Sequence, residues 1–193
     1  MDEKSDLDFF VITKPGRLWI ARTLLVLYKR LVLLNSHKHF CINYFVDYNH
    51  LEIEEKNIFT ATELATIIPL YGHKYYSQLI HKNDWIIKFF PNYQPRELIN
   101  ESSDTPGWIK KLLEGFIDFC GGALTDKIFM SLSLKRWKRI YQSHYKKNDF
   151  QVAFKTKKYV SKNHPNHYQK KVIELYEQKL KDFSAHFDLM KYE

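Results

Sequence analysis

Several features that define whole classes of protein are scarce or missing in this sequence. It has two cysteines among 193 residues, Cys41 and Cys120, which excludes a disulfide framework of the kind found in small secreted domains. Its first residues are acidic and polar and do not form a signal peptide. No internal repeat or low-complexity tract is present. A reducing compartment is the simplest setting, so we predict a cytoplasmic protein.

A long uninterrupted apolar run is also missing. The segment 18–34 is about as long as a short membrane span, but Arg22, Lys29 and Arg30 interrupt it. Its apolar residues recur at helical spacing, which favours a helix that is buried against a sheet. We therefore expect no membrane partner.

Hydrophobic residues are plentiful. They make up 45% of the chain, and aromatic residues make up 16%, which indicates a folded protein and not a disordered one. A chain of this length can form one domain with a real core, or a smaller core with a helical appendage.

Two acidic residues stand two apart at the start of an apolar run. Asp6 and Asp8 precede residues 9–12, which are apolar at every position and predict a strand that is covered on both faces. Alternate side chains of a strand lie on the same side, so the two carboxylates would project together and a divalent cation such as Mg²⁺ would hold them. The pattern is short, and two solvated acids ahead of a buried strand also match it.

The elements expected after this strand follow a familiar order. A turn over 13–17 leads into a helix over 18–34, and a second strand is expected over 39–47. With the text SDLDFFVIT, this order resembles the nucleotidyltransferase superfamily of the DNA polymerase β type. More narrowly, the chain resembles a group of uncharacterised bacterial nucleotidyltransferase-domain proteins, through most of its length as far as SKNHPNHYQKKVIELYEQKL.

The resemblance implies an α+β fold, a truncated nucleotidyltransferase-type mixed sheet with helices followed by a C-terminal helical region. It also implies transfer of a nucleoside monophosphate from a nucleoside triphosphate to an acceptor, with two Mg²⁺ ions bridged by Asp6 and Asp8. The superfamily's third acid lies on a neighbouring strand. Asp47 is the favoured residue and Glu52 the next, although each also fits an exposed acid with no ligand. Asn43 occupies a mid-strand position, where an amide is a poorer ligand for Mg²⁺.

Nucleotide binding is assigned to Lys14 and Arg17, in the turn after the acidic pair. The superfamily's Gly-Ser pair, which contacts the phosphates from a position upstream of the acids, has no counterpart, because this sequence begins five residues before Asp6. We therefore expect either a truncated or a degenerate form, in which the phosphate-holding half of the site is absent; an active and an inactive chain both stay open.

Beyond the second strand the pattern becomes helical. Further helices are expected over 61–70, 74–90, 108–120, 122–144 and 165–183. The segment 92–107 is rich in turn-forming residues and predicts a linker between a core at 1–91 and a helical domain at 108–193.

Basic residues concentrate in the C-terminal half. The region 135–171 contains twelve Lys or Arg and a single acid, Asp149. Its interleaved aromatic residues are Trp137, Tyr141, Tyr145, Phe150, Phe154 and Tyr159. Cations neutralise phosphates and exposed rings stack on bases, so a nucleic-acid acceptor is a predicted partner. A solvated helix face whose aromatic residues point into the core fits the same pattern.

Three function classes follow from these observations. The first is a Mg²⁺-dependent nucleotidyltransferase that takes a nucleoside triphosphate as its substrate. The second is a non-catalytic nucleic-acid-binding or regulatory relative with the same fold. The third is a partner-binding protein whose aromatic helices form an interface.

Overall fold

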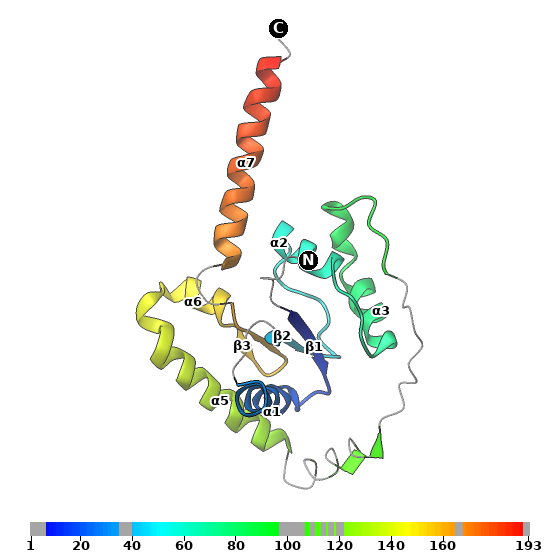
Figure 1. Cartoon of the computed structure of the whole chain (residues 1–193), viewed down its shortest axis with the longest axis vertical. Helices are drawn as coiled ribbons and strands as arrows, with labels where there is room; N and C mark the ends of the chain where they lie inside the picture. Colours follow the sequence, from blue (N-terminus) through cyan, green and yellow to red (C-terminus); the bar gives the residue numbers. More distant parts are fainter. Residues whose placement is uncertain are drawn as a thin grey trace.

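The computed structural model describes residues 7–34, 40–96, 107–108, 111–112, 115, 118, 122–164 and 168–190, with side chains as far as residue 185. The elements follow one another in the order β1 (Asp8–Thr13), α1 (Leu18–Leu31), β2 (Cys41–Asp47), α2 (Ile58–Ala65), α3 (His73–Lys82), η1 (Asp84–Lys88), α5 (Gly122–Tyr141), η2 (Gln142–His144), α6 (Lys147–Ala153), β3 (Thr156–Lys157), β4 (Val160–Lys162) and α7 (Tyr168–Met190). Figure 1 shows how they are arranged in space. The α+β fold class predicted from the sequence is confirmed.

The four strands form one mixed sheet in the order β1-β2-β4-β3. β1 and β2 run parallel, so that Asp8 lies opposite Cys41 and Thr13 lies opposite Asp47. β4 pairs antiparallel with both β2 and β3. Parallel neighbours need a crossover connection, and α1 supplies it here.

Helices cover both faces of the sheet, as the apolar run in β1 requires. Towards α2, α3 and η1 the buried core consists of Tyr44, Val46, Leu51, Ile53, Ala61, Leu64, Leu79, Trp85, Ile86 and Val160. Towards α1, α5 and α6 it consists of Leu18, Trp19, Ile42, Phe45, Trp137, Phe150, Ala153 and Phe154. Successive residues of β1 contribute to opposite cores, because side chains alternate along a strand.

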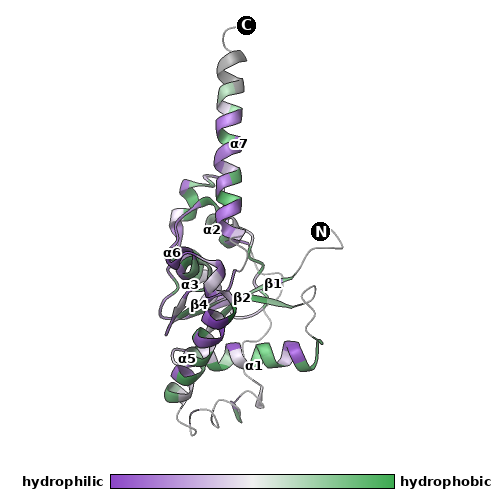
Figure 2. Cartoon of the chain, turned by 90° about the vertical axis from the view of Figure 1, so that its left-hand side faces the viewer, coloured by the Kyte–Doolittle hydropathy of each residue, from purple (hydrophilic) through white to green (hydrophobic). Residues whose placement is uncertain are grey.

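The longest helix, α7, extends away from this layered body, as Figures 1 and 2 both show. Exposed apolar residues along it include Tyr168, Leu175, Leu180 and Phe183. In the described part of the chain, no helix has the length and apolarity that crossing a membrane requires.

The sequence interpretation missed β3 and β4, because strands of two and three residues are too short to show alternation. It also missed α6, a helix of 7 residues, which is about two turns and too short to show a helical period. The region 108–193 is therefore not helical throughout. β4 joins the same sheet as β2, and both cores contain residues from each side of the segment 92–107. The predicted division into 1–91 and 108–193 therefore cuts through one sheet.

Two predicted helices have different bounds in the structure. The helix expected over 61–70 runs from Ile58 to Ala65, because the side chain of Asn57 caps it by accepting a hydrogen bond from the Thr60 amide at 3.0 Å. The helix expected over 74–90 is split at Asn83 into α3 and η1. Asn83 is completely buried. Its side-chain amide accepts a hydrogen bond from the backbone N–H of Ile53, in the loop before α2, and donates to the backbone carbonyls of Leu51 and Leu79.

The charged residues of α1 that argued against a membrane span are accommodated by packing. Arg22 is 5% exposed and its guanidinium lies over the rings of Phe45, at 5.2 Å, and Trp137, at 4.9 Å. Burial lowers the pKa of Arg22 to about 10, so the side chain keeps its charge at neutral pH. Cation–π contact offsets part of the cost of desolvating it.

A carboxylate from another helix caps the start of α1. The Arg17 side chain does not cap the helix, and Asp126 of α5 instead accepts hydrogen bonds from the amides of Trp19 at 2.7 Å and Ile20 at 3.0 Å. The first amides of a helix have no partner within it and favour a nearby negative charge. Asp126 therefore connects α5 to the start of the crossover helix.

Replacing this carboxylate should destabilise the fold. We expect Asp126→Ala to lower the free energy of unfolding by about 2–3 kcal/mol, since two buried amides lose their acceptor. Urea unfolding at pH 7 measures the change, with Asp182→Ala on the exposed surface of α7 as the matched control, expected to cost less than about 0.5 kcal/mol. An equal effect of the two substitutions would contradict the capping role.

Candidate functional site

Asp8 is the first residue of β1 and its side chain is exposed to solvent. It lies at the edge of the sheet where β1 and β2 both begin, opposite Cys41. Asp6, the other member of the predicted pair, lies outside the described residues. The structure thus places one of the two carboxylates, at an accessible strand end.

A β-bulge in β2 brings Asn43 to Asp8. Phe9 pairs with Ile42 and Phe10 with Tyr44, which leaves Asn43 as the extra residue. Its amide nitrogen donates a hydrogen bond to Oδ1 of Asp8 at 2.7 Å, and its amide oxygen accepts one from the Cys41 thiol at 3.2 Å. We call these three polar residues, Asp8, Cys41 and Asn43, the Asp8 edge.

Asp47 lies at the opposite end of the sheet. It pairs with Thr13, five residue steps from Asp8 along β1, which corresponds to roughly 16 Å. Its carboxylate accepts a hydrogen bond from the Asn49 amide at 3.0 Å and lies 2.7 Å from Nδ1 of His50, within the turn that follows β2. The structure does not bring Asp47 to Asp8, and one metal ion cannot bind both.

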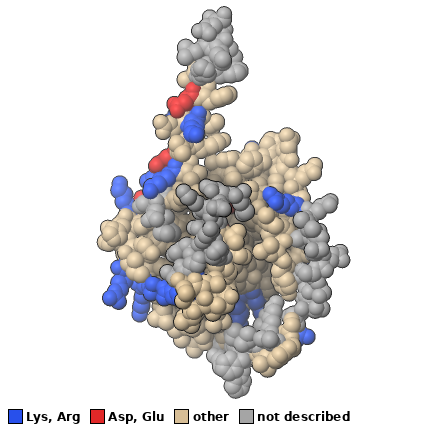
Figure 3. Space-filling model, in the orientation of Figure 1, with Lys and Arg blue, Asp and Glu red and all other residues tan. Residues whose placement is uncertain are grey.

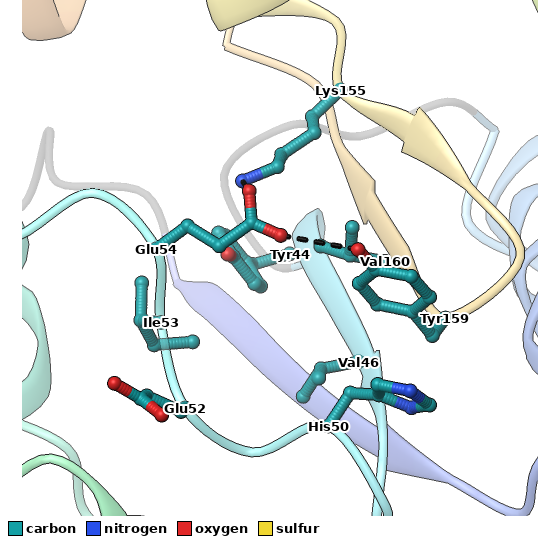
Figure 4. A pocket seen from close by; sticks show the side chains of 9 residues that line it. All are labelled: Tyr44, Val46, His50, Glu52, Ile53, Glu54, Lys155, Tyr159 and Val160. Atoms are coloured by element: carbon teal, nitrogen blue, oxygen red, sulfur yellow. Dashed lines mark hydrogen bonds and ion pairs between the residues drawn. The ribbon is translucent and has the colours of Figure 1, made fainter.

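Glu52 also lies away from the Asp8 edge, beside residues of the strand end that carries Asp47. It is exposed and pairs with Lys56 at 2.7 Å. Figure 4 shows Glu52 pointing away from Glu54, whose carboxylate contacts Lys155 at 2.8 Å and Tyr159 at 3.2 Å. The hydrogen bond from Lys155 is the largest of the effects that lower the pKa of Glu54 to about 2. Both glutamates are thus held by lysines.

The two predicted nucleotide-binding cations follow the end of β1, not its beginning. Arg17 pairs with Asp118, and Nζ of Lys14 lies 3.9 Å from the same carboxylate. Because β1 separates them from Asp8, the structure does not bring Lys14 or Arg17 to the Asp8 edge.

A further acid that the sequence interpretation missed is electrostatically coupled to Asp8. Although the side chain of Glu63 on α2 is accessible, desolvation raises its pKa to about 7. The charge of Lys162 opposes this rise, and the charges of Asp8 and Glu55 add to it. No local pattern in the sequence distinguishes Glu63 from any other helical surface acid.

Two buried lysines, Lys162 and Lys29, lie near the acids Glu55 and Glu63 and near Cys41, respectively. Lys162 on β4 is 1% exposed and donates to Gln169; burial lowers its pKa, while Glu55 and Glu63 oppose the shift. Lys29 on α1 is 8% exposed and acts on the Cys41 thiol by lowering its pKa. Positive charge therefore lies close to the Asp8 edge, supplied by residues other than those predicted.

The predicted acceptor region, 135–171, divides into an exposed set of cations and a buried set of rings. Lys135, Arg136, Lys138 and Arg139 on α5 are exposed, and Figure 3 shows Lys and Arg gathered at the left, over α5 and α6. Trp137, Phe150 and Phe154 are buried, and Tyr141 and Tyr145 pack against Phe154. The buried rings are not available to stack on bases, because they form the core.

Within the described ranges, no three His, Cys, Asp or Glu side chains are grouped closely enough to hold a metal ion. The protein-family models, the curated proteins and the solved structures with which the chain was compared contain no match. The site is therefore interpreted from its own geometry.

The reactivity of Cys41 reports on the Asp8 edge. Burial raises the pKa of this thiol, and the charge of Asp8 and a hydrogen bond with it raise the pKa further. Asp8→Asn should therefore increase the thiolate fraction at a given pH and speed alkylation several-fold.

Iodoacetamide labelling at pH 8, in a Cys120→Ser background so that one thiol remains, measures the rate. Glu52→Gln removes an exposed carboxylate outside the Asp8 edge and should leave the rate unchanged. An unchanged rate in Asp8→Asn would show that Asp8 and Cys41 do not interact.

Proposed function

We propose that the Asp8 edge binds a magnesium–nucleoside triphosphate complex and that the chain is a nucleotidyltransferase of the DNA polymerase β type. The observation that carries this proposal is the exposed Asp8 carboxylate, oriented by Asn43 at 2.7 Å at the start of an edge strand whose half-buried side chains pack into both cores. Asp6, two residues earlier, is the second proposed ligand. Carboxylates on one side of a strand end are suited to a hard divalent cation.

The proposed chemistry is transfer of the nucleotidyl group. A hydroxyl oxygen of the acceptor attacks the α-phosphorus and forms a new O–P bond, while the bond to the leaving pyrophosphate breaks and the hydroxyl proton passes to a base or to water. Asp8 and Asp6 would hold the metal, which would supply positive charge to the triphosphate and to the leaving pyrophosphate. Asp8 and Asp6 supply position and charge.

The ligand set departs from three carboxylates. Asn43 stands on the strand next to Asp8, and its amide oxygen already accepts from Cys41. The charge of Asp8 adds to the raised pKa of Glu63, but less than desolvation does, and no hydrogen bond joins the two carboxylates among the described contacts. The proposed ligands are therefore the two carboxylates Asp8 and Asp6.

Substitution of Asp8 tests the proposal. Mn²⁺ binding, measured by electron paramagnetic resonance with each of the four ribonucleoside triphosphates in turn, should weaken at least tenfold in Asp8→Asn, because a charged ligand is replaced by a neutral one. Glu52→Gln removes an acid that is held by Lys56 and should change the affinity less than twofold.

Thermal unfolding checks that both variants are folded. The proposal is rejected if folded Asp8→Asn binds the metal–nucleotide complex as tightly as the unsubstituted chain. Labelling of an acceptor in a cell extract from each α-labelled triphosphate then tests the transfer step itself, and Asp8→Asn should abolish it.

A non-catalytic nucleic-acid-binding function is the second candidate. The exposed cations of α5 favour it, since the only acid in that helix, Asp126, is buried and bonded to α1. With the neighbouring rings in the core, such binding would depend on phosphate contacts and not on base stacking.

Salt dependence distinguishes this candidate. For a single-stranded 20-mer, Lys138→Gln with Arg139→Gln should reduce the slope of log K against log salt by about 1.4, because each phosphate contact contributes about 0.7. Lys179→Gln with Lys181→Gln removes the same charge from α7 and should leave the slope unchanged. Salt-independent binding, or no binding, would exclude a phosphate-binding surface on α5.

A further inference from the structure

The helix α7 carries apolar side chains along a part of its length that lies away from the rest of the molecule. Figures 1 and 2 show it extending from the layered body, and its start lies beside α2 and α6. Farther along, Tyr176, Leu180 and Phe183 are 41%, 47% and 66% exposed. Helices in proteins are stabilised mainly by packing an apolar face against other elements. The described residues of the body leave this face of α7 largely uncovered.

The apolar residues of α7 follow the spacing of a coiled coil. Steps of three and four residues alternate along the sequence from Ile173 through Tyr176, Leu180, Phe183 and Phe187 to Met190. We call these six positions the α7 seam. A repeat of this kind places its side chains in one narrow stripe, and a second helix with the same repeat packs into it. The spacing therefore indicates that the partner of this stripe is a helix.

The charged residues of α7 balance one another. Between residues 168 and 190 the sequence has four lysines and four acids: Lys170, Lys171, Lys179, Lys181, Glu174, Glu177, Asp182 and Asp188. The helix is thus neutral, and the net charge of +8 belongs to the rest of the chain. Two copies of α7 can approach each other without net repulsion between the helices. An anionic membrane or a nucleic acid, in contrast, is attracted by an excess of cations, which α7 lacks.

We propose that two copies of the chain associate through the α7 seam, each seam packing against that of the other copy. The seam is suited to pairing with itself, because it is an apolar stripe on a helix of zero net charge. Two-fold pairs are also the commonest assembly of soluble proteins. Tyr176, Leu180 and Phe183 would pack between side chains of the second helix and lose their exposure to water. This interface shares no residue with the Asp8 edge and does not depend on nucleotide binding there.

Sedimentation equilibrium of the full chain, over a hundredfold range of protein concentration, measures the association. We expect a monomer–dimer equilibrium, which Leu180→Ser and Phe183→Ser should each weaken at least tenfold. Leu175→Ser is the matched control: it removes an apolar side chain that is 54% exposed on the same helix, at a position outside the α7 seam. It should change the dissociation constant less than threefold. Circular dichroism checks that all three variants keep their helical content.

Two further measurements do not rely on weakening the interface. Tyr176→Leu should tighten the dimer several-fold, because leucine is the residue that paired helices prefer at this place in the repeat. Added salt screens the repulsion between the two basic bodies and should leave the dimer intact or tighten it, whereas a dimer bridged by nucleic acid would dissociate. A folded chain that stays monomeric at every concentration, equal weakening by Leu175→Ser, or dissociation by salt would each overturn the proposal.

Discussion

The parallel pairing of β1 with β2 decides which polar side chains can act together. Because the two strands run in the same direction, residues that begin them share one edge of the sheet and residues that end them share the other. Asp8 is therefore grouped with Cys41, and Asp47 with Thr13. The bulge in β2 adds Asn43 to the first group, at hydrogen-bond distance from Asp8. The crossover helix that makes this pairing possible is anchored in turn by a carboxylate of α5.

The antiparallel strand β4 brings a second set of charged groups close to the same edge. Its last residue, Lys162, pairs with Tyr44, and the next residue, Asn163, donates its amide to the Asn43 carbonyl at 3.0 Å. The buried Lys162 is sensitive to the charges of both Glu55 and Glu63. A buried ammonium near two acids compensates part of their charge.

Charge and aromatic content serve different purposes in the C-terminal half. Trp137 faces the core, while Lys138 and Arg139 beside it on α5 face solvent. The ring of Phe154 contacts the rings of Trp137, Tyr141, Tyr145 and Phe150. The aromatic residues of this region therefore mainly contribute to the core. A nucleic acid that bound this surface would be attracted through its phosphates. This follows from helical periodicity, because adjacent residues on a helix point in different directions.

The sequence by itself determined the local elements: an apolar run at every position predicted a strand with two covered faces, and helical spacing predicted α1, α5 and α7. Local pattern was enough there, because burial of a face repeats with the period of the element. The partners of Asp8 were decided only by the tertiary structure. A shift of one residue in strand register moves a side chain to the other face, and the bulge at Asn43 is such a shift. The side chains of β1 pack into two cores that also contain residues far away in the sequence, and no short stretch of sequence encodes those contacts.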